Sequence, residues 1–471
     1  MAGTEETLHP EIHETGRPEI YNEEGWIDQG YLEVVERAIE DGDADFLRAD
    51  AGRLHQSELA DLLVALPAER RPEFIRLMGE EFDFTALTEV DDSIRHEIVE
   101  RMPNAQIATA VEGLDSDDAV YILEDLDEED QADILARLPF TERIRLRRSL
   151  EYPEETAGRR MQTEFVAVPP FWSVGQTIDY MREEKNLPDS FAQVFVVDPT
   201  FRLIGTVDLD RILRSSRDVK AEDVMHETRH AIPATMDQEE AALLFQQYDL
   251  LSAAVVDEND RLVGVLTIDD VVDVIQEEAE EDIMRLGGVG DEELSYTVLR
   301  TTRARFLWLL INLATALLAS FVISWFDAPI HDMVSLAVLM PIVASMGGNA
   351  GTQTMTVAVR ALATRDLDIY NVTRIVRRET AVGLLNGLVF AAIMGAITVF
   401  WFTNTNLGMV IGAAMIINLI AAALAGILIP LVLHRMGTDP AVASTVFVTT
   451  VTDVVGFFSF LGLASWWFRL H

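Results

Sequence analysis

The segment from Asp439 to Asp453, DPAVASTVFVTTVTD, carries one carboxylate at each end of a run of small, β-branched and apolar residues. It belongs to the last long hydrophobic run of the chain. If that run is a membrane helix, the carboxylates lie about 21 Å apart along its axis, so an Asp439 at the water interface leaves Asp453 deep in the bilayer. A charge at that depth is costly and predicts a water-filled cavity or an ion beside Asp453. The alternative is a protonated Asp453 hydrogen-bonded to a neighbouring helix.

The other acidic residues are concentrated in the first 300 residues. The net charge is −43, yet only seven of the 79 acidic residues lie beyond residue 300. Such a surface argues against nucleic acid and favours either divalent cations or a high-salt cell. The high-salt explanation stays open because Lys185 and Lys220 are the only lysines beside 34 arginines. The lack of cysteine excludes disulfides and thiolate metal sites.

Apolar runs near the C-terminus are long enough to cross a bilayer. The sequence predicts five spans, at about 306–326, 333–358, 380–402, 408–434 and 440–468. Arginines precede the first span and occupy the loops between the second and third and between the fourth and fifth spans. The positive-inside rule therefore predicts a cytosolic N-terminus and a C-terminus outside. The polar N-terminal residues lack the apolar region of a cleavable signal peptide, which agrees with a cytosolic start.

The first half of the chain is expected to be soluble and begins with helices. Residues 1–26 read as a flexible leader, and residues 27–150 contain a leucine-then-proline phrase that ends at Pro67, Pro103 and Pro139, with a constant spacing of 36 residues. This period predicts a small α-solenoid in which each proline ends one helix and opens the next. Most of its acidic groups are expected to be solvated outer faces.

Residues 158–276 contain a duplication, with units at about 158–216 and 221–276. The phrases FRLIGTVDLDRIL and DRLVGVLTIDDVV align Gly205 with Gly264, 59 residues apart. Here the chain resembles a tandem CBS-domain pair, a β-α-β-β-α regulatory module. In such modules the Gly-x-x-Thr-x-x-Asp signature binds adenosine nucleotides, so the resemblance makes Thr267 and Asp270 a candidate ATP site.

The first copy departs from this signature, because Asp208 and Arg211 occupy its Thr and Asp positions. His226 to His230 also matches the zinc-protease phrase H-E-x-x-H, which needs both histidines on one helical face. The phrase falls in a loop and strand of the second unit, so zinc catalysis is not expected.

From Asp269 the sequence predicts one acidic helix, DDVVDVIQEEAEEDIMRL. Residues 277–305, which begin within this helix, are expected to link it to the first span. Like charges on adjacent turns repel one another. The acids either form a solvated face or are bridged by divalent cations, which take several carboxylate oxygens.

The membrane phrases PIVASMGGNAGTQ at 341–353, RALATRDLD at 360–368 and DPAVASTVFVTTVTD closely resemble the MgtE family of magnesium channels. The resemblance extends from about residue 27 to the C-terminus. It implies a multidomain membrane protein with a cytosolic α-solenoid N domain, a tandem CBS α/β pair, a linking "plug" helix and a five-helix transmembrane domain at 306–471. It also implies a homodimer in which Asp453 and backbone carbonyls hold hydrated Mg²⁺ in a pore between two chains.

Mg²⁺ keeps several waters, so one carboxylate with hydroxyls such as that of Thr449 suits an outer-sphere site. Asn349 and Asp439 are expected to shape the route. The resemblance implies that regulatory Mg²⁺ ligands are Asp237, Glu239, Asp249, Asp270, Asp273, Glu278, Glu281 and Asp282.

The sequence and this resemblance thus predict a Mg²⁺ channel of the cell inner membrane that cytosolic Mg²⁺ closes. An enzymatic activity is not expected. Two alternatives remain, a transporter of Co²⁺ or Mn²⁺ and a CBS-regulated channel gated mainly by nucleotide.

Overall fold

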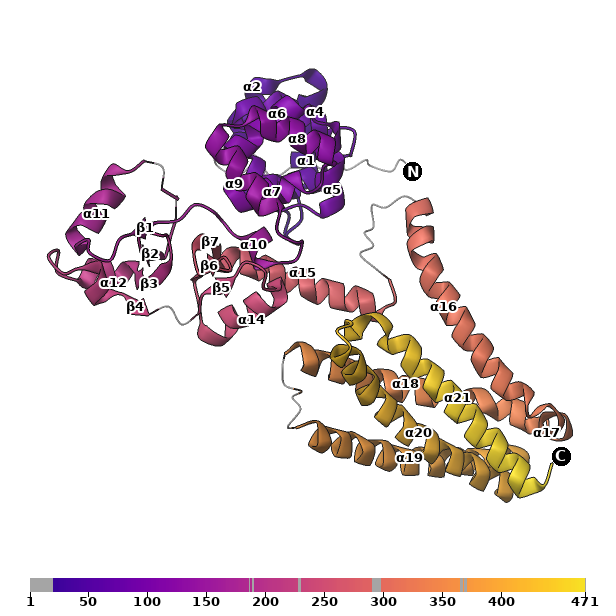
Figure 1. Ribbon diagram of the computed structural model, residues 1–471. Coiled ribbons are helices and arrows are strands. Elements are labelled where there is room, and N and C mark those ends of the chain that lie inside the picture. The colour runs from indigo at the N-terminus through magenta and orange to yellow at the C-terminus, as the bar shows by residue number, and fades with distance from the viewer. Residues whose placement is uncertain are drawn as a thin grey trace, which may run out of the picture. The chain divides into compact units, whose positions relative to one another are not determined.

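The computed structural model describes residues 20–185, 187–188, 190–227, 230–289, 298–364, 367 and 371–470. The chain divides into two compact units, Met1–Gln276 and Glu277–His471. In Figure 1 the first unit contains a helical region followed by a region of strands and helices, and the second contains long helices.

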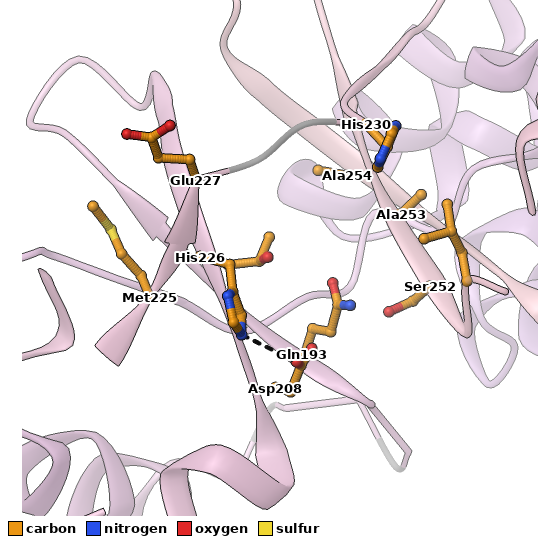
Figure 2. A pocket seen from close by; sticks show the side chains of 11 residues that line it. Gln193, Asp208, Met225, His226, Glu227, His230, Ser252, Ala253 and Ala254 are labelled. Atoms are coloured by element: carbon orange, nitrogen blue, oxygen red, sulfur yellow. Dashed lines mark ion pairs between the residues drawn. The ribbon is translucent and has the colours of Figure 1, made fainter. Parts of the chain in front are cut away.

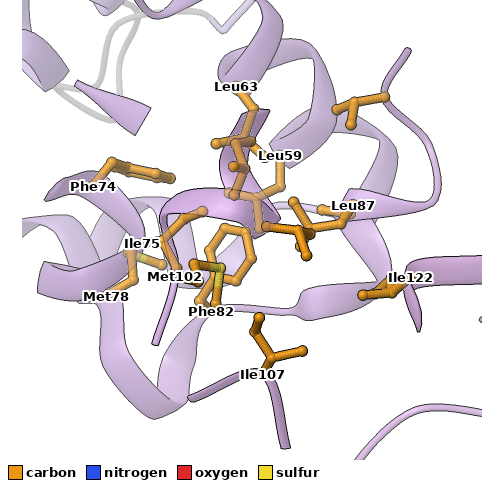
Figure 3. Close-up of a cluster of buried hydrophobic side chains, with 14 of the residues drawn as sticks. Leu59, Leu63, Phe74, Ile75, Met78, Phe82, Leu87, Met102, Ile107 and Ile122 are labelled. Atoms are coloured by element: carbon orange, nitrogen blue, oxygen red, sulfur yellow. The ribbon is translucent and has the colours of Figure 1, made fainter. Parts of the chain in front are cut away.

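Short helices make up the N-terminal region. They are α1 Gln29–Asp41, α2 Ala44–Asp50, η1 Ala51–Arg53, α3 Gln56–Ala65, α4 Arg71–Met78, η2 Gly79–Glu81, η3 Phe84–Leu87, α5 Asp92–Arg101, α6 Asn104–Glu112, α7 Ser116–Leu123, α8 Glu128–Arg137 and α9 Phe140–Leu150. Figure 3 shows Phe74, Ile75 and Met78 of α4 among side chains from the neighbouring helices. The core is therefore built by helices too short to be stable alone.

The three prolines of the repeat lie between helices. Pro67 falls between α3 and α4, while Pro103 and Pro139 are the N-cap residues of α6 and α9. Proline fits there because a residue at the start of a helix needs no intrahelical N–H partner. The helix boundaries agree with the repeat, whereas the solenoid arrangement itself stays a prediction.

Residues 20–26, expected as part of a flexible leader, are attached to the helical region. Tyr21 pairs with Ile27 in a β-bridge, and its hydroxyl donates to Asp61 of α3 at 2.7 Å. The sequence of residues 20–26 did not indicate this contact, because the contact depends on Asp61, which lies 40 positions away.

Two small sheets follow. The elements are α10 Ala157–Arg160, β1 Ala167–Val168, α11 Val174–Glu183, β2 Gln193–Val197, β3 Leu203–Asp208, α12 Leu209–Arg214, α13 Ala221–Val224, β4 His226–Glu227, β5 Ile232–Pro233, α14 Gln238–Tyr248, β6 Ser252–Val256, β7 Leu262–Thr267 and α15 Ile268–Leu286. The sheet orders are β1-β2-β3-β4 and β5-β6-β7, and only β1–β2 and β5–β6 are parallel. Val196 pairs with Gly205 and Val255 with Gly264, so the predicted duplication has matching register.

The two sheets exchange chain segments. β4, which belongs to the second sequence unit, completes the first sheet by pairing with β3. Met225 packs on Gly205, and Met161 of the first unit packs on Gly264 of the second. A Cβ at either glycine would lie within 2.8 Å of these sulfur or backbone atoms. The duplicated glycine therefore makes room for the crossing segment.

The second unit consists mainly of α16 Val298–Ser324, α17 Asp327–Asp332, α18 Ser335–Ala363, α19 Val372–Phe402, α20 Thr405–Arg435 and α21 Pro440–Phe468. α20 packs against α18, α19 and α21 and has the most buried residues of the four. Figure 1 shows these four helices side by side. α20 is therefore the central helix of the bundle.

Each predicted span coincides with one long helix. Within the described residues, four helices are long and apolar enough to cross a membrane: Thr301–Ser324, Val372–Phe402, Thr405–Arg435 and Thr445–Phe468. α18 is not among them, because it contains Gly347 to Gln353 with several polar groups. The predicted link at 277–305 comprises the end of α15, residues 290–297 outside the described part, and the start of α16.

Candidate ion pathway and regulatory sites

α21 carries Asp453 and is helical despite its many β-branched residues. Asp439 caps its N-terminus by accepting from the Ala441 amide at 2.8 Å, and Pro440 opens the first turn. Threonine hydroxyls bond back to the helix, that of Thr449 to the Thr445 carbonyl at 2.9 Å and that of Thr452 to the Thr449 carbonyl at 2.9 Å. These bonds satisfy the hydroxyls among apolar neighbours.

The PIVASMGGNAGTQ segment of α18 lies beside this part of α21. Gly351 faces Val448, and Gly348 faces Thr452, which is fully buried. Asp453 is half-buried, whereas Asn349 is exposed. Because Asn349 follows Gly347 by two residues, it lies on the opposite side of α18 from the glycines packed inside the bundle. The structure thus brings the segments of Asp453 and Asn349 together, with Asn349 on an outer face.

Sequence reasoning missed Asn418 in the middle of α20. Its side chain is fully buried, and its amide nitrogen donates to the Val343 carbonyl of α18 at 2.8 Å. Its Oδ1 has no hydrogen-bond partner in the described part of the chain. A lone asparagine in an apolar run matches no motif, and its only signal was its cost inside a membrane helix.

Asp439 also meets the C-terminal end of α15. Its Oδ2 is 2.6 Å from Nη1 of Arg285, which forms a second ion pair with Glu281. The Thr445 hydroxyl donates to the Leu286 carbonyl at 3.2 Å. Burial, and then the charge of Asp439, raise the pKa of Asp282. One predicted pore residue and two predicted regulatory acids are therefore gathered around a single arginine that sequence reasoning did not assign.

Asp270 and Asp273, near the start of α15, lie close to acids of the N-terminal helical region within the first unit. Burial and the charge of Asp270 raise the pKa of Asp118 to about 7, and hold that of Asp117 well above its usual range. Burial raises the pKa of Asp270 to about 6, although Thr267 donates to its carboxylate. Burial and the nearby Glu89 raise that of Asp273. The start of α7, expected to be a solvated face, instead lies near the acidic side of α15.

The remaining regulatory candidates do not gather at one point. Asp237 is the N-cap of α14 and accepts from the Glu239 amide at 3.0 Å, while Asp249 is its left-handed C-cap. The two ends of this helix are about 18 Å apart, so they cannot share one ion within a chain. Glu278 and Glu239 are half-buried. Among the described residues, no group of three or more His, Cys, Asp or Glu could hold a metal ion.

The two candidate nucleotide-binding residues, Thr267 and Asp270, do not line the same cavity. Thr267 lines a cavity of about 470 Å³ together with Asp269 and the aromatic residues Phe165, Phe191 and Phe195. Asp270 does not line it, because its carboxylate is bonded to Thr267 and lies near the acids of α7. The neighbouring Asp269 supplies a carboxylate instead.

Figure 2 shows a second cavity, of about 630 Å³, at the H-E-x-x-H phrase. His226 and Glu227 are adjacent residues of β4, and alternate residues of a strand point to opposite faces. The His226 ring lies 3.8 Å from Asp208 and contacts Arg211, whereas His230 stacks on Tyr248. The helical geometry of a zinc protease is therefore not formed by these residues.

Family models match three parts of the chain in order. They are the MgtE intracellular N domain at residues 54–155, the CBS domain at 157–218 and 221–277, and MgtE, a divalent cation transporter, at 340–463. Among solved structures, the cytosolic domain of the Mg²⁺ channel MgtE in complex with ATP is 26% identical and covers 52% of this chain and 99% of its own, with a TM-score of 0.48.

Two of three curated relatives match the chain nearly end to end. The magnesium transporter MgtE of Bacillus subtilis is 27% identical, with 92% of this chain and 97% of the relative covered. Its counterpart in Thermus thermophilus is 31% identical, with 91% and 97% covered, and that of Enterococcus faecalis is 34% identical over 68% and 71%. The family models match its domains in order, and the Thermus thermophilus relative is matched over almost its whole length. The chain therefore belongs to the MgtE family of divalent cation transporters.

Proposed function

We propose that the protein conducts Mg²⁺ into the cytosol through a pathway that passes Asp453. The observation that carries this proposal is a half-buried carboxylate in a membrane helix whose residues Val448 and Thr452 pack on the glycines of α18. A charge at membrane depth needs an aqueous or ionic partner. No energy-consuming step is required, because moving a charge of +2 through 100 mV releases about 4.6 kcal/mol.

The pathway lies between two copies of the chain in the inner membrane. α18 serves as the second of the five spans, since a segment with polar groups is tolerated at membrane depth where it lines water or protein. Asn349 on the outer face of α18 and Asp439 at the cytosolic mouth shape the route, and Thr449 contributes a hydroxyl beside hydrated Mg²⁺. The N-terminus is cytosolic and the C-terminus lies outside, as the arginines indicate.

Cytosolic Mg²⁺ closes this pathway through the acids of the CBS region, α7 and α15. The raised pKa values of Asp117, Asp118 and Asp270 indicate carboxylates that repel one another unless protons or cations neutralise them. Bound Mg²⁺ would hold these elements together and keep α15 at the mouth. Mg²⁺ can close the pathway only if it binds these carboxylates more tightly in the closed state than in the open state.

Adenosine nucleotides bind at the cavity of Thr267. Its aromatic walls and the Asp269 carboxylate fit a base and a ribose diol, and its volume of about 470 Å³ suits a small ligand. The buried Ser252 hydroxyl at its wall has no partner in the described part of the chain, which leaves it available for a polar ligand.

Mg²⁺ flux into proteoliposomes tests the proposal. Asp453→Ala should lower the flux about a hundredfold, the cost of about 3 kcal/mol when one partner of a buried charge interaction is lost. Asp332→Asn, which removes a carboxylate at the end of α17, is the matched control and should conduct as the wild type does. Wild-type flux through folded Asp453→Ala would overturn the pore assignment. Competition with Co²⁺ and Mn²⁺ decides between Mg²⁺ and the alternative cargo.

A further inference from the structure

Asn418 is a polar side chain in the centre of the helical bundle. It is fully buried in α20 among apolar residues, uses its amide nitrogen for the Val343 carbonyl and leaves Oδ1 without a partner in the described part of the chain. The orientation is fixed because only the NH₂ group can donate to a carbonyl. A leucine would fill a similar volume without burying an unpaired acceptor.

Glycines on two other helices make room for this amide. A Cβ built on Gly456 of α21 would lie 2.8 Å from the Asn418 nitrogen, and one on Gly347 of α18 would collide with the same group. The Asn418 side chain therefore occupies the junction of α18, α20 and α21.

The junction lies one helical turn from the predicted ion site. Gly456 follows Asp453 by three residues, and Thr452, one turn before Gly456, is fully buried and faces Gly348. Since i, i+3 and i, i+4 positions share a helix face, the amide fixes α18 and α21 beside the Asp453 segment.

α18 needs such support from outside. Pro341 lies within this helix and lacks the N–H that would bond to the carbonyl four residues earlier, and Gly347, Gly348 and Gly351 follow. Proline and glycine are the usual causes of helix bending. The Val343 carbonyl, which lies between the proline and the glycines, is the group that Asn418 holds.

We propose that Asn418 is a positioning residue that sets the spacing of α18 and α21 beside Asp453, and thereby the discrimination between Mg²⁺ and other cations. This inference rests on the proposed function. In this proposal the amide is not a ligand of the ion. It acts through the Val343 carbonyl and through the two glycines that pack on it.

The test is the ratio of Mg²⁺ to Na⁺ flux in proteoliposomes, measured after wild type and Asp453→Ala have been compared. Asn418→Leu removes the hydrogen bond, and Gly456→Ala displaces the amide from the other side. Each should lower the ratio about threefold or more, the effect of one interhelical hydrogen bond in a membrane. A change in total flux alone would indicate simple packing.

Two controls separate positioning from general disturbance. Thr398→Val removes a buried hydroxyl of α19 that has no partner in the described residues. Gly462→Ala adds a Cβ on α21 at an ordinary contact distance of 3.8 Å from Phe326. Both should keep the wild-type ratio. A wild-type ratio in folded Asn418→Leu overturns the inference, and if that variant does not fold, a wild-type ratio in Gly456→Ala does so. If the wild type carries no Mg²⁺, the proposed function fails first.

Discussion

Acidic residues are handled in opposite ways in the two units. In Met1–Gln276, Asp117 and Asp118 of α7 lie near Asp270, and their pKa values are raised by burial and by the charge of Asp270. In Glu277–His471, Asp439 lies 2.6 Å from Arg285. A cluster of like charges is stabilised when protons or soluble cations bind, whereas a charge-balanced cluster holds without them. The proposed sensing of Mg²⁺ would therefore act through the first cluster, and the second would retain a position.

Neutralising three acids of α15 should have the largest effect on this contrast. In Asp270→Asn with Asp273→Asn and Glu281→Gln, the Mg²⁺ concentration that closes half of the channels should rise about tenfold or more, within the usual range of coupling between sites. Open probability in excised patches measures it. Asp218→Asn, Asp223→Asn and Glu258→Gln remove the same charge at exposed positions and form the control. Closure of the first variant at the wild-type concentration would favour a high-salt surface.

The like-charged cluster should also make stability depend on pH. Folded-state pKa values of about 7 for Asp118 and about 6 for Asp270 exceed the usual 3.8, so their stabilising contribution is complete below about pH 4 and is lost as pH rises through 6 and 7. With chelator, the full-length protein in detergent should melt a few degrees lower at pH 8 than at pH 5.5, about 1 kcal/mol in a domain of this size.

Millimolar Mg²⁺ should reduce that difference, because a bound cation replaces the protons. Asp117→Asn with Asp118→Asn should reduce it as well, in the absence of Mg²⁺. A pH difference that persists in this variant would place its origin elsewhere in the acidic unit.

The charge-balanced cluster should give the smallest effect. Arg285→Gln frees Asp439 and Glu281, and its open probability at low Mg²⁺ should rise about threefold, as expected for a partly exposed ion pair. Arg147→Gln breaks a pair with Glu151 at the same i, i+4 spacing in α9 and serves as the control. Single-channel recording measures both. An unchanged open probability in Arg285→Gln would show that the Arg285–Asp439 ion pair does not hold α15 in place and contradicts the prediction.

Local patterns in the sequence predicted much of the fold. The duplicated glycines gave matching strand registers at Gly205 and Gly264, and the acidic run from Asp269 is one helix. Such features depend on residues close in sequence. The five-span count and the solenoid depend on long-range arrangement and remain predictions.

Contacts between distant residues could not be predicted in this way. Arg285 and Asp439 are 154 residues apart, and nothing near either indicates the other. Asp117 and Asp118 read as solvated because the sequence does not reveal which helix face another element covers. Asn418 lacks any neighbouring motif. Thr267, predicted as a nucleotide-binding residue, lines a cavity, but the carboxylate beside it there is that of Asp269 rather than Asp270.

The crossing of β4 into the first sheet determines how this gene can be dissected. A fragment that stops after residue 218 would lose β4 and would leave the β3 edge unpaired and Gly205 uncovered by Met225. A fragment that starts at residue 221 would lack Met161 and Gln162, which pack on Gly264 and Val265 of β7. Exposed strand edges promote aggregation. The two copies are therefore one folding unit, and expression boundaries or domain exchanges with other transporters must keep residues 157–277 intact.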